Sequence, residues 1–155
     1  MQMGVNQHRV GAAAEQLVAA HLIGKGHDVF FPAVTQSRVD LIYTTGADSR
    51  RVQVKVGTRF KAVGGKEYEN VKLRVSGVNR VGGSRPYAPD EIDELWVLGT
   101  HLWCIPARVV VGRSMISLTS KDPLVWTRRD YDCDEFIIMR GEWDNPMRSV
   151  IGIGG

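Results

Sequence analysis

The 155-residue sequence has few cysteines and no long apolar run, and each shortage excludes a class of protein. Cys104 and Cys133 are the only cysteines and neither lies in a CxxC motif, so nothing favours a disulfide. The four histidines are scattered without the spacing of zinc ligands. No apolar stretch approaches the roughly 20 residues of a membrane-spanning helix, and the polar segment 1–9 does not resemble a signal peptide. We therefore expect a cytoplasmic protein with no membrane partner.

What the sequence does contain is enough apolar residues for one packed core. Hydrophobic residues make up 43% of the chain, and no linker or internal repeat divides it. We expect a single domain over 1–155, with a flexible tail at 148–155. A helix, three strands and a mixed remainder follow one another, which favours an α/β fold built on a mixed sheet.

Hydrophobic periodicity places the main elements. Apolar residues at helical spacing predict a helix over 8–25. Residues 51–57 (RVQVKVG) alternate strictly and predict a strand. The other expected elements are strands at 28–33, 38–44 and 68–76, loops at 58–67 and 77–89, a hairpin formed by 92–99 and 101–105, a short helix at 106–111, and short strands at 115–119 and 136–139.

Positive charge is concentrated in the middle of the chain. Between Arg50 and Arg85 there are ten basic residues and two acidic ones, Glu67 and Glu69. A basic stretch of this kind is typical of a surface that binds a phosphate backbone, although a solvated lysine- and arginine-rich surface has the same composition. We expect the region 58–89 to contact DNA. The candidate phosphate contacts are Arg38, Arg51, Arg59, Lys61, Lys72, Arg74, Arg80 and Arg85.

Two carboxylates stand in apolar surroundings. Glu15 shares a helix face with Gly11, Val18 and Leu22, and Asp40 interrupts the apolar run VDLIY. A carboxylate placed there needs a partner, because burying a lone charge costs several kcal/mol. The alternatives are an ordinary surface ion pair for Glu15 and a structural pairing of Asp40 with an arginine.

Gln53 and Lys55 lie two residues apart on a predicted strand, so both side chains point away from the layer of valines. A short turn separates this strand from that of Asp40, and hairpin pairing brings the three residues together. If the first helix packs on the same face, Glu15 points at the same spot. Lys55 as a solvated lysine of an edge strand is the alternative.

This set of side chains has the chemistry of a magnesium site. Carboxylate and amide oxygens without thiolates suit Mg²⁺, with Mn²⁺ as a substitute, better than zinc. We predict that Glu15, Asp40 and Gln53 are the metal ligands. Lys55, the fourth predicted catalytic residue, orients the attacking water or stabilises the developing negative charge.

The same residues carry a family resemblance. The pattern formed by Glu15, the VD at 39–40 and the QVK at 53–55 resembles the PD-(D/E)XK nuclease superfamily. The string GAAAEQLVAAHLIGKGHDVFFP…SRVDLIY…RVQVKVGT is similar to its branch of group I intron homing endonucleases, in which Gln replaces the third acid. The resemblance covers roughly 11–111. It implies a restriction-endonuclease-like core with helices flanking a mixed central sheet, a divalent-metal nuclease activity, and a homo-oligomer, either a dimer or a tetramer.

Three functions remain open at this point. The first is a Mg²⁺-dependent DNA endonuclease of the homing or restriction type that acts at specific sites in double-stranded DNA. The second is a structure-specific resolvase of branched DNA such as a Holliday junction. The third is a DNA-binding module that keeps the fold without catalysis, because Gln53 removes one negative charge from the metal site.

Overall fold

The computed structural model describes residues 7–61, 63–73, 85–119 and 131–141. The chain begins with helix α1 (Gln7–Gly24), as its apolar periodicity predicts. The helix ends where Gly26 takes a positive φ of 94° and where the backbone N–H of His27 turns back to the carbonyl of Leu22. None of the described helices is long and apolar enough to cross a membrane.

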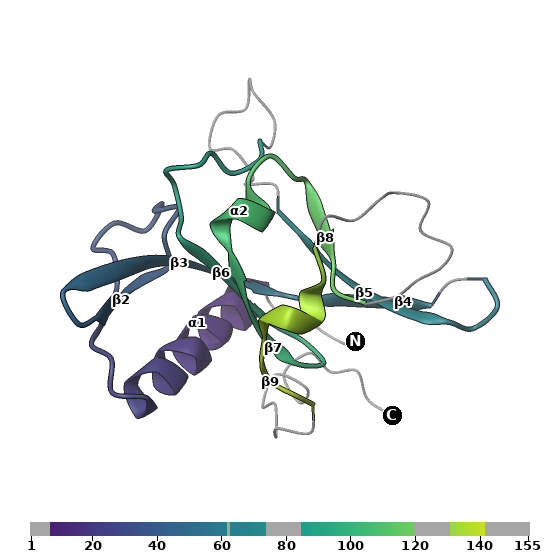
Figure 1. Ribbon diagram of the computed structural model, residues 1–155, viewed down its shortest axis with the longest axis horizontal. Helices are drawn as coiled ribbons and strands as arrows, with labels where there is room; N and C mark the ends of the chain where they lie inside the picture. The colour runs from purple at the N-terminus through teal and green to yellow at the C-terminus, as the bar shows by residue number, and fades with distance from the viewer. Residues whose placement is uncertain (1–6, 62, 74–84, 120–130, 142–155) are drawn as a thin grey trace, which may run out of the picture.

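A mixed six-stranded sheet forms the centre of the molecule (Figure 1). Its strand order is β1-β2-β3-β6-β7-β9, and β3 pairs with β6 in parallel while the other neighbours are antiparallel. The parallel pair requires a crossover, and the chain makes it by leaving this sheet between β3 and β6. The strands are β1 (Val29–Phe30), β2 (Leu41–Thr45), β3 (Asp48–Val56), β6 (Glu94–Leu98), β7 (Leu102–Pro106) and β9 (Ile137–Met139).

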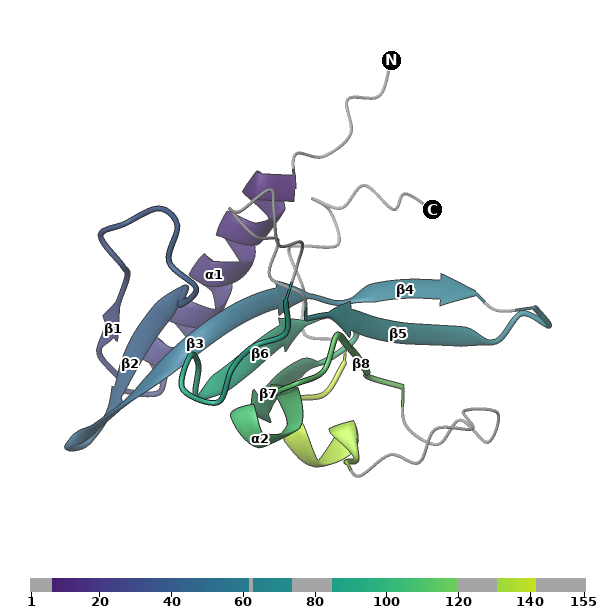
Figure 2. The same cartoon turned by 90° about the horizontal axis from the view of Figure 1, so that it is seen from above.

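A second sheet of three strands carries part of the basic region. It consists of β4 (Thr58–Lys61), β5 (Glu67–Lys72) and β8 (Met115–Ser117), in the order β4-β5-β8. Gly57 alone separates β3 from β4, so one long run of extended chain passes from the central sheet into the second one (Figure 2). The described part is completed by the short helix α2 (Ala107–Val110) and the 3₁₀ turn η1 (Cys133–Phe136).

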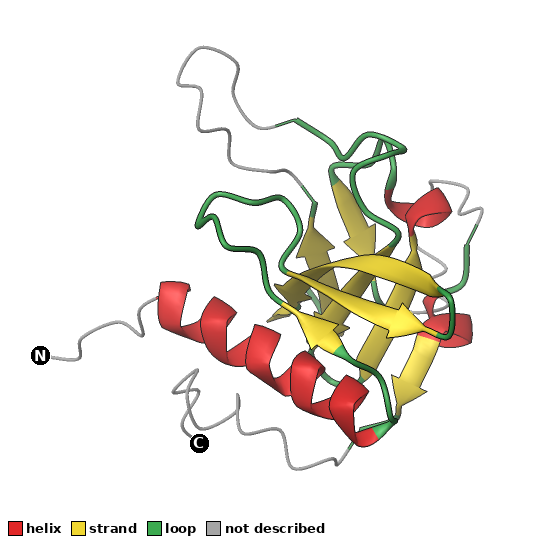
Figure 3. Cartoon of the chain, turned by 90° about the vertical axis from the view of Figure 1, so that its left-hand side faces the viewer, coloured by secondary structure: helices red, strands yellow, loops and turns green. Residues whose placement is uncertain are grey.

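The central sheet buries its two faces in two different cores. Helix α1 lies along one face, as Figure 3 shows, and its apolar side chains pack on Leu41, Val52 and Val54. On the opposite face, Leu95 and Trp103 pack against the second sheet, α2 and η1. Burial of apolar surface in these two layers is the main stabilising contribution to the fold.

The predicted elements are confirmed in the centre and corrected at the margins. The hairpin of β6 and β7 and the short helix α2 lie where the sequence places them. The strand expected over 28–33 is only two residues long, and the strand expected over 68–76 begins at Glu67 and ends as strand β5 at Lys72. The loop expected over 58–67 is wrong, because its first four residues form β4. All four side chains of β4 are exposed, so it has no alternating pattern, and its strand character comes from pairing with β5.

A buried carboxylate joins the second sheet to the β6–β7 turn. Glu69 is 6% exposed, and its oxygens accept hydrogen bonds from Nε of Arg59 at 3.0 Å and from the backbone N–H of Thr100 at 3.2 Å. Gly99 permits this approach, because a Cβ there would lie 2.9 Å from both carboxylate oxygens. The contact therefore fixes the β4–β5 hairpin relative to the central sheet.

We expect Glu69→Ala to lower the free energy of unfolding by about 2 kcal/mol, because a buried N–H and a guanidinium lose their acceptor. Glu67→Ala on the same strand is the matched control, since Glu67 and Lys61 are both exposed and lie 4.0 Å apart. An exposed pair of this kind contributes little. Urea unfolding followed by tryptophan fluorescence measures both variants, and equal losses of stability would contradict the role given to Glu69.

Candidate metal and catalytic site

The candidate site lies where pairing between β2 and β3 stops. The last regular contact is the backbone N–H of Asp40, which donates to the carbonyl of Val52 at 2.8 Å. Beyond this contact, β2 provides no backbone partner for β3, and the Asp40 carboxylate accepts hydrogen bonds from β3 instead. Its Oδ2 accepts from the backbone N–H of Val54 at 2.8 Å and from Nε2 of Gln53 at 2.7 Å. Asp40 thus directly precedes β2 instead of lying inside it, and its side chain is fixed from two directions.

Glu15 reaches Asp40 from the helix, although not from the side that the sequence indicates. The condition that α1 packs on the face of Gln53 and Lys55 is not met, because its apolar residues are buried against the valines on the opposite face of β3. Strand β2 begins only at Leu41, so Asp40 stands at the strand end. There the carboxyl groups of Glu15 and Asp40 are hydrogen-bonded to each other.

The pKa values of the two carboxyl groups are both raised. Burial, the nearby charge of Asp40 and the hydrogen bond to Asp40 raise the pKa of Glu15 from 4.5 to about 7. Burial also raises the pKa of Asp40, while the Val54 N–H, Glu15 and the positive charge of Lys55 oppose this rise. Burial and the nearby negative charge thus favour the protonated form of Glu15.

Lys55 lies on the same strand as Gln53 and has an ammonium group that no residue in the described ranges engages. It lies two residues after Gln53 on β3, so both side chains share the face opposite Val54. Its ammonium is near enough to lower the pKa of Asp40. Among the residues that the structure describes, none forms a hydrogen bond or ion pair with this ammonium. Its hydrogen-bond donors are therefore available to a phosphate or to a water molecule.

The oxygen atoms gathered here fit a hard divalent cation. Oδ2 of Asp40 is engaged by two donors, so the oxygens that could hold a cation are Oδ1 of Asp40, those of the Glu15 carboxylate and the Gln53 amide oxygen. In the described ranges, no three His, Cys, Asp or Glu side chains are placed together so as to hold a metal ion. The donor set is thus two carboxylates and one amide, which suits Mg²⁺, Mn²⁺ or Ca²⁺.

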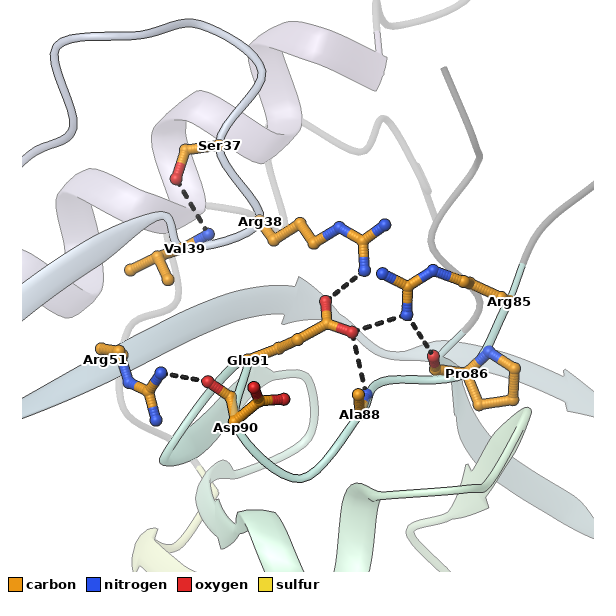
Figure 4. A network of polar contacts seen from close by, with 9 residues as sticks. All are labelled: Ser37, Arg38, Val39, Arg51, Arg85, Pro86, Ala88, Asp90 and Glu91. Atoms are coloured by element: carbon orange, nitrogen blue, oxygen red, sulfur yellow. Dashed lines mark hydrogen bonds and ion pairs between the residues drawn. The ribbon is translucent and has the colours of Figure 1, made fainter. Parts of the chain in front are cut away.

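The predicted phosphate contacts fall into different surroundings. Arg38 and Arg85 both bind the carboxylate of Glu91, whereas Arg51 donates to the carbonyl of Asp90 (Figure 4). Arg51 also binds the carboxylate of Asp93. Arg59 is paired with Glu69. Lys61 and Lys72 are exposed on β4 and β5. Arg74 and Arg80 lie outside the described residues, as does the tail at 148–155.

Sequence reasoning missed two residues beside the site. Glu91 is the common partner of Arg38 and Arg85, and Tyr87 is 2% exposed, with a pKa raised by burial and by the charges of Asp40 and Glu91. The sequence offers one signal, because the acidic run Asp90–Asp93 directly follows the basic stretch. It does not show which bases these acids hold.

Comparison with known proteins is consistent with this arrangement. The profile of a family described as PD-(D/E)XK endonuclease matches residues 5–123. Protein 5.3 of Escherichia phage T7 is 34% identical over 74 residues, and the match spans 48% of this chain and 60% of the phage protein. The solved structure of the bacterial homing endonuclease I-Ssp6803I is similar with a TM-score of 0.68 and 20% identity, over 85% of this chain and 88% of that one. The expected fold and superfamily are thereby confirmed.

The raised pKa of Glu15 predicts how stability depends on pH. Because the folded state holds this proton more tightly than the unfolded state does, the metal-free protein loses stability as pH rises from about 4.5 to about 7. Glu15→Gln removes this loss. After allowance for solvent screening, we expect the variant to be of order 1 kcal/mol more stable than the wild type at pH 8. Thermal melts in EDTA at pH 5 and pH 8 measure the effect, with Glu67→Gln as the exposed control. A wild type that gains stability between these pH values relative to Glu15→Gln would contradict the assignment.

The hydrogen bond from Gln53 to Asp40 predicts a trade between stability and metal affinity. Gln53→Glu replaces this donor by a third carboxylate, so we expect the metal-free protein to be about 1–2 kcal/mol less stable at pH 8. The added charge should strengthen Ca²⁺ binding on the order of tenfold. Calorimetric titration with Ca²⁺ and a melt in EDTA measure the two effects. Unchanged or weaker Ca²⁺ binding would show that Gln53 does not face the cation.

Proposed function

The chain belongs to the PD-(D/E)XK endonuclease family, and we propose that it is a divalent-metal-dependent DNA endonuclease that hydrolyses phosphodiester bonds at specific sites in double-stranded DNA. The observation that carries the proposal is the Asp40 carboxylate, which is held by Gln53 and by the β3 backbone and is hydrogen-bonded to Glu15. The structural likeness to a homing endonuclease favours the homing or restriction type.

In this proposal Asp40, Glu15 and the amide oxygen of Gln53 hold one Mg²⁺, for which Mn²⁺ is a substitute. A bound divalent cation supplies charge stabilisation at the scissile phosphate and lowers the pKa of the attacking water. The Val54 N–H and Nε2 of Gln53 orient the Asp40 carboxylate before the substrate arrives. This fixed orientation reduces the reorganisation needed during the reaction.

Lys55 completes the proposed site. Its ammonium lies on the same strand face as Gln53, so it can donate to the attacking water or to a phosphate oxygen as negative charge develops. Its positive charge also favours ionised Asp40, the form of this side chain that binds the cation. Lys55 is therefore proposed to act on the reacting groups directly and on the metal ligand electrostatically.

The basic region suggests how the substrate is held. The exposed residues Lys61 and Lys72 on the second sheet, with Arg38 and Arg85 beside the candidate site, are proposed to contact the phosphate backbone. Each chain contributes one such site, and cutting both strands of a duplex requires two. We therefore propose that the active form is a homo-oligomer, either a dimer or a tetramer.

We expect Asp40→Ala and Lys55→Met to lower Mg²⁺-dependent cleavage of duplex DNA by at least about a hundredfold, because each removes a charge that acts at the reacting phosphate. Lys25→Met, at the end of α1, is the control and should cleave as the wild type does. The measurement is single-turnover cleavage of a library of linear duplexes and of a four-way junction. Preferential cutting of the junction would favour a resolvase, and salt-dependent binding without any cleavage would favour a non-catalytic DNA-binding module.

A further inference from the structure

A mostly buried carboxylate holds two arginines side by side next to the candidate site. The side chain of Glu91 is 13% exposed, while those of Arg38 and Arg85 are 37% and 50% exposed. Nη1 of Arg38 donates to Oε2 of Glu91, and Nη1 of Arg85 donates to Oε1 at 2.6 Å. The backbone N–H of Ala88 donates to the same Oε1 at 3.0 Å and so anchors the carboxylate (Figure 4).

This arrangement leaves most of the hydrogen-bonding capacity of both arginines unused. A guanidinium has five N–H donors, and each of these two engages Glu91 through one nitrogen atom. Arg85 adds only a 3.3 Å contact from that same nitrogen to the carbonyl of Pro86. The three side chains together carry one net positive charge, which matches the single negative charge of a phosphodiester. Paired guanidiniums with unused donors are well suited to grip phosphate oxygens.

Arg51 provides a contrast in the same region of the chain. Its Nε and Nη2 bind the two oxygens of Asp93, and its Nη1 binds the carbonyl of Asp90. All three of its guanidinium nitrogens are thus engaged within the protein. The corresponding Nε and Nη2 atoms of Arg38 and Arg85 have no such partner in the described part of the chain.

The arginine pair adjoins the candidate site along two separate segments. Arg38 precedes Asp40 by two residues, a backbone distance of at most about 7 Å. Arg85 lies two residues before Tyr87. The charges of Asp40 and Glu91 both act on Tyr87 and raise its pKa. A phosphate gripped by this pair therefore lies close to a phosphate that reacts at Asp40.

We propose that Arg38 and Arg85 jointly bind one backbone phosphate adjacent to the scissile phosphate, and that Glu91 is the positioning residue that holds both guanidiniums in place. The position of the scissile phosphate rests on the function proposed above. An acid facing a nucleic acid weakens general electrostatic attraction. The presence of Glu91 here is explained by the geometry that its carboxylate imposes on Arg38 and Arg85.

The salt dependence of DNA binding tests whether one phosphate is shared. Binding of the full chain to duplex DNA is measured in Ca²⁺, which replaces Mg²⁺ during the titration, for Arg38→Gln, Arg85→Gln, the double variant and the control Lys25→Gln. Loss of one phosphate contact lowers the slope of log K against log salt by about one. We expect the double variant to lose about one and the control to lose nothing. A loss of about two would mean two separate phosphates, and no loss would mean no contact; either result would overturn the shared site.

The role of Glu91 is tested in a double-variant cycle. Glu91→Gln keeps the shape of the side chain and removes its charge. We expect its single-turnover cleavage rate in Mg²⁺ at saturating DNA to fall about tenfold, because the phosphate next to the reacting one is misplaced. In the Arg38→Gln/Arg85→Gln background the same substitution should change the rate no further. Tighter DNA binding with an unchanged rate, or an equal loss in both backgrounds, would overturn the positioning role.

These two tests separate failure of the inference from failure of the proposed function. A wild type that binds DNA in Ca²⁺ but does not cleave in Mg²⁺ refutes the endonuclease activity, while the salt slopes still decide whether the arginine pair binds a phosphate. A wild type that cleaves, with slopes unaffected by both arginine substitutions, refutes the arginine pair alone. Thermal melts of every variant identify any rate change that comes from lost folding.

Discussion

Pairing between β2 and β3 stops at Asp40, and from that point its carboxylate takes over the hydrogen bond that a continuing strand would have made to Val54. The remainder of the candidate site depends on this substitution. It holds the carboxylate at the end of β2, with Oδ2 bonded to the β3 backbone. It also places the Gln53 amide 2.7 Å from the same oxygen. The carboxylate at this strand end is thus held in a fixed orientation.

In the candidate site, clustered negative charge that would attract a cation also lowers the stability of the protein. Burial raises the pKa values of both Glu15 and Asp40, and repulsion from the charge of Asp40 raises that of Glu15 further. Gln53 relieves part of this repulsion, because a neutral amide donates to Asp40 where a third carboxylate would add negative charge. The same neutrality weakens the attraction for a cation. In the proposed metal site, Gln53 therefore favours ligands that are already in place before a cation binds over the tightest cation binding.

The basic residues of the middle region are used in two distinct ways. Arg51 and Arg59 are tied into ion pairs with Asp93 and the buried Glu69, and these contacts fix the loop before β6 and the β4–β5 hairpin. The exposed lysines and the arginines on Glu91 keep donors directed away from the protein. Fully engaged bases and bases with unused donors thus occur in the same part of the chain, and total charge alone does not distinguish them. The acidic partner of each base makes the distinction.

Local sequence was sufficient for the helix, the β6–β7 hairpin and the alternation that puts Gln53 and Lys55 on one strand face, because periodicity and turn residues act over a few positions. It also singled out Glu15 and Asp40, since a carboxylate in an apolar run requires a partner. The packing side of α1, the strand character of β4 and the gathering of Arg38 and Arg85 on Glu91 were decided only in the tertiary structure. Each depends on contacts between segments far apart in the chain, where burial and pairing override any local pattern.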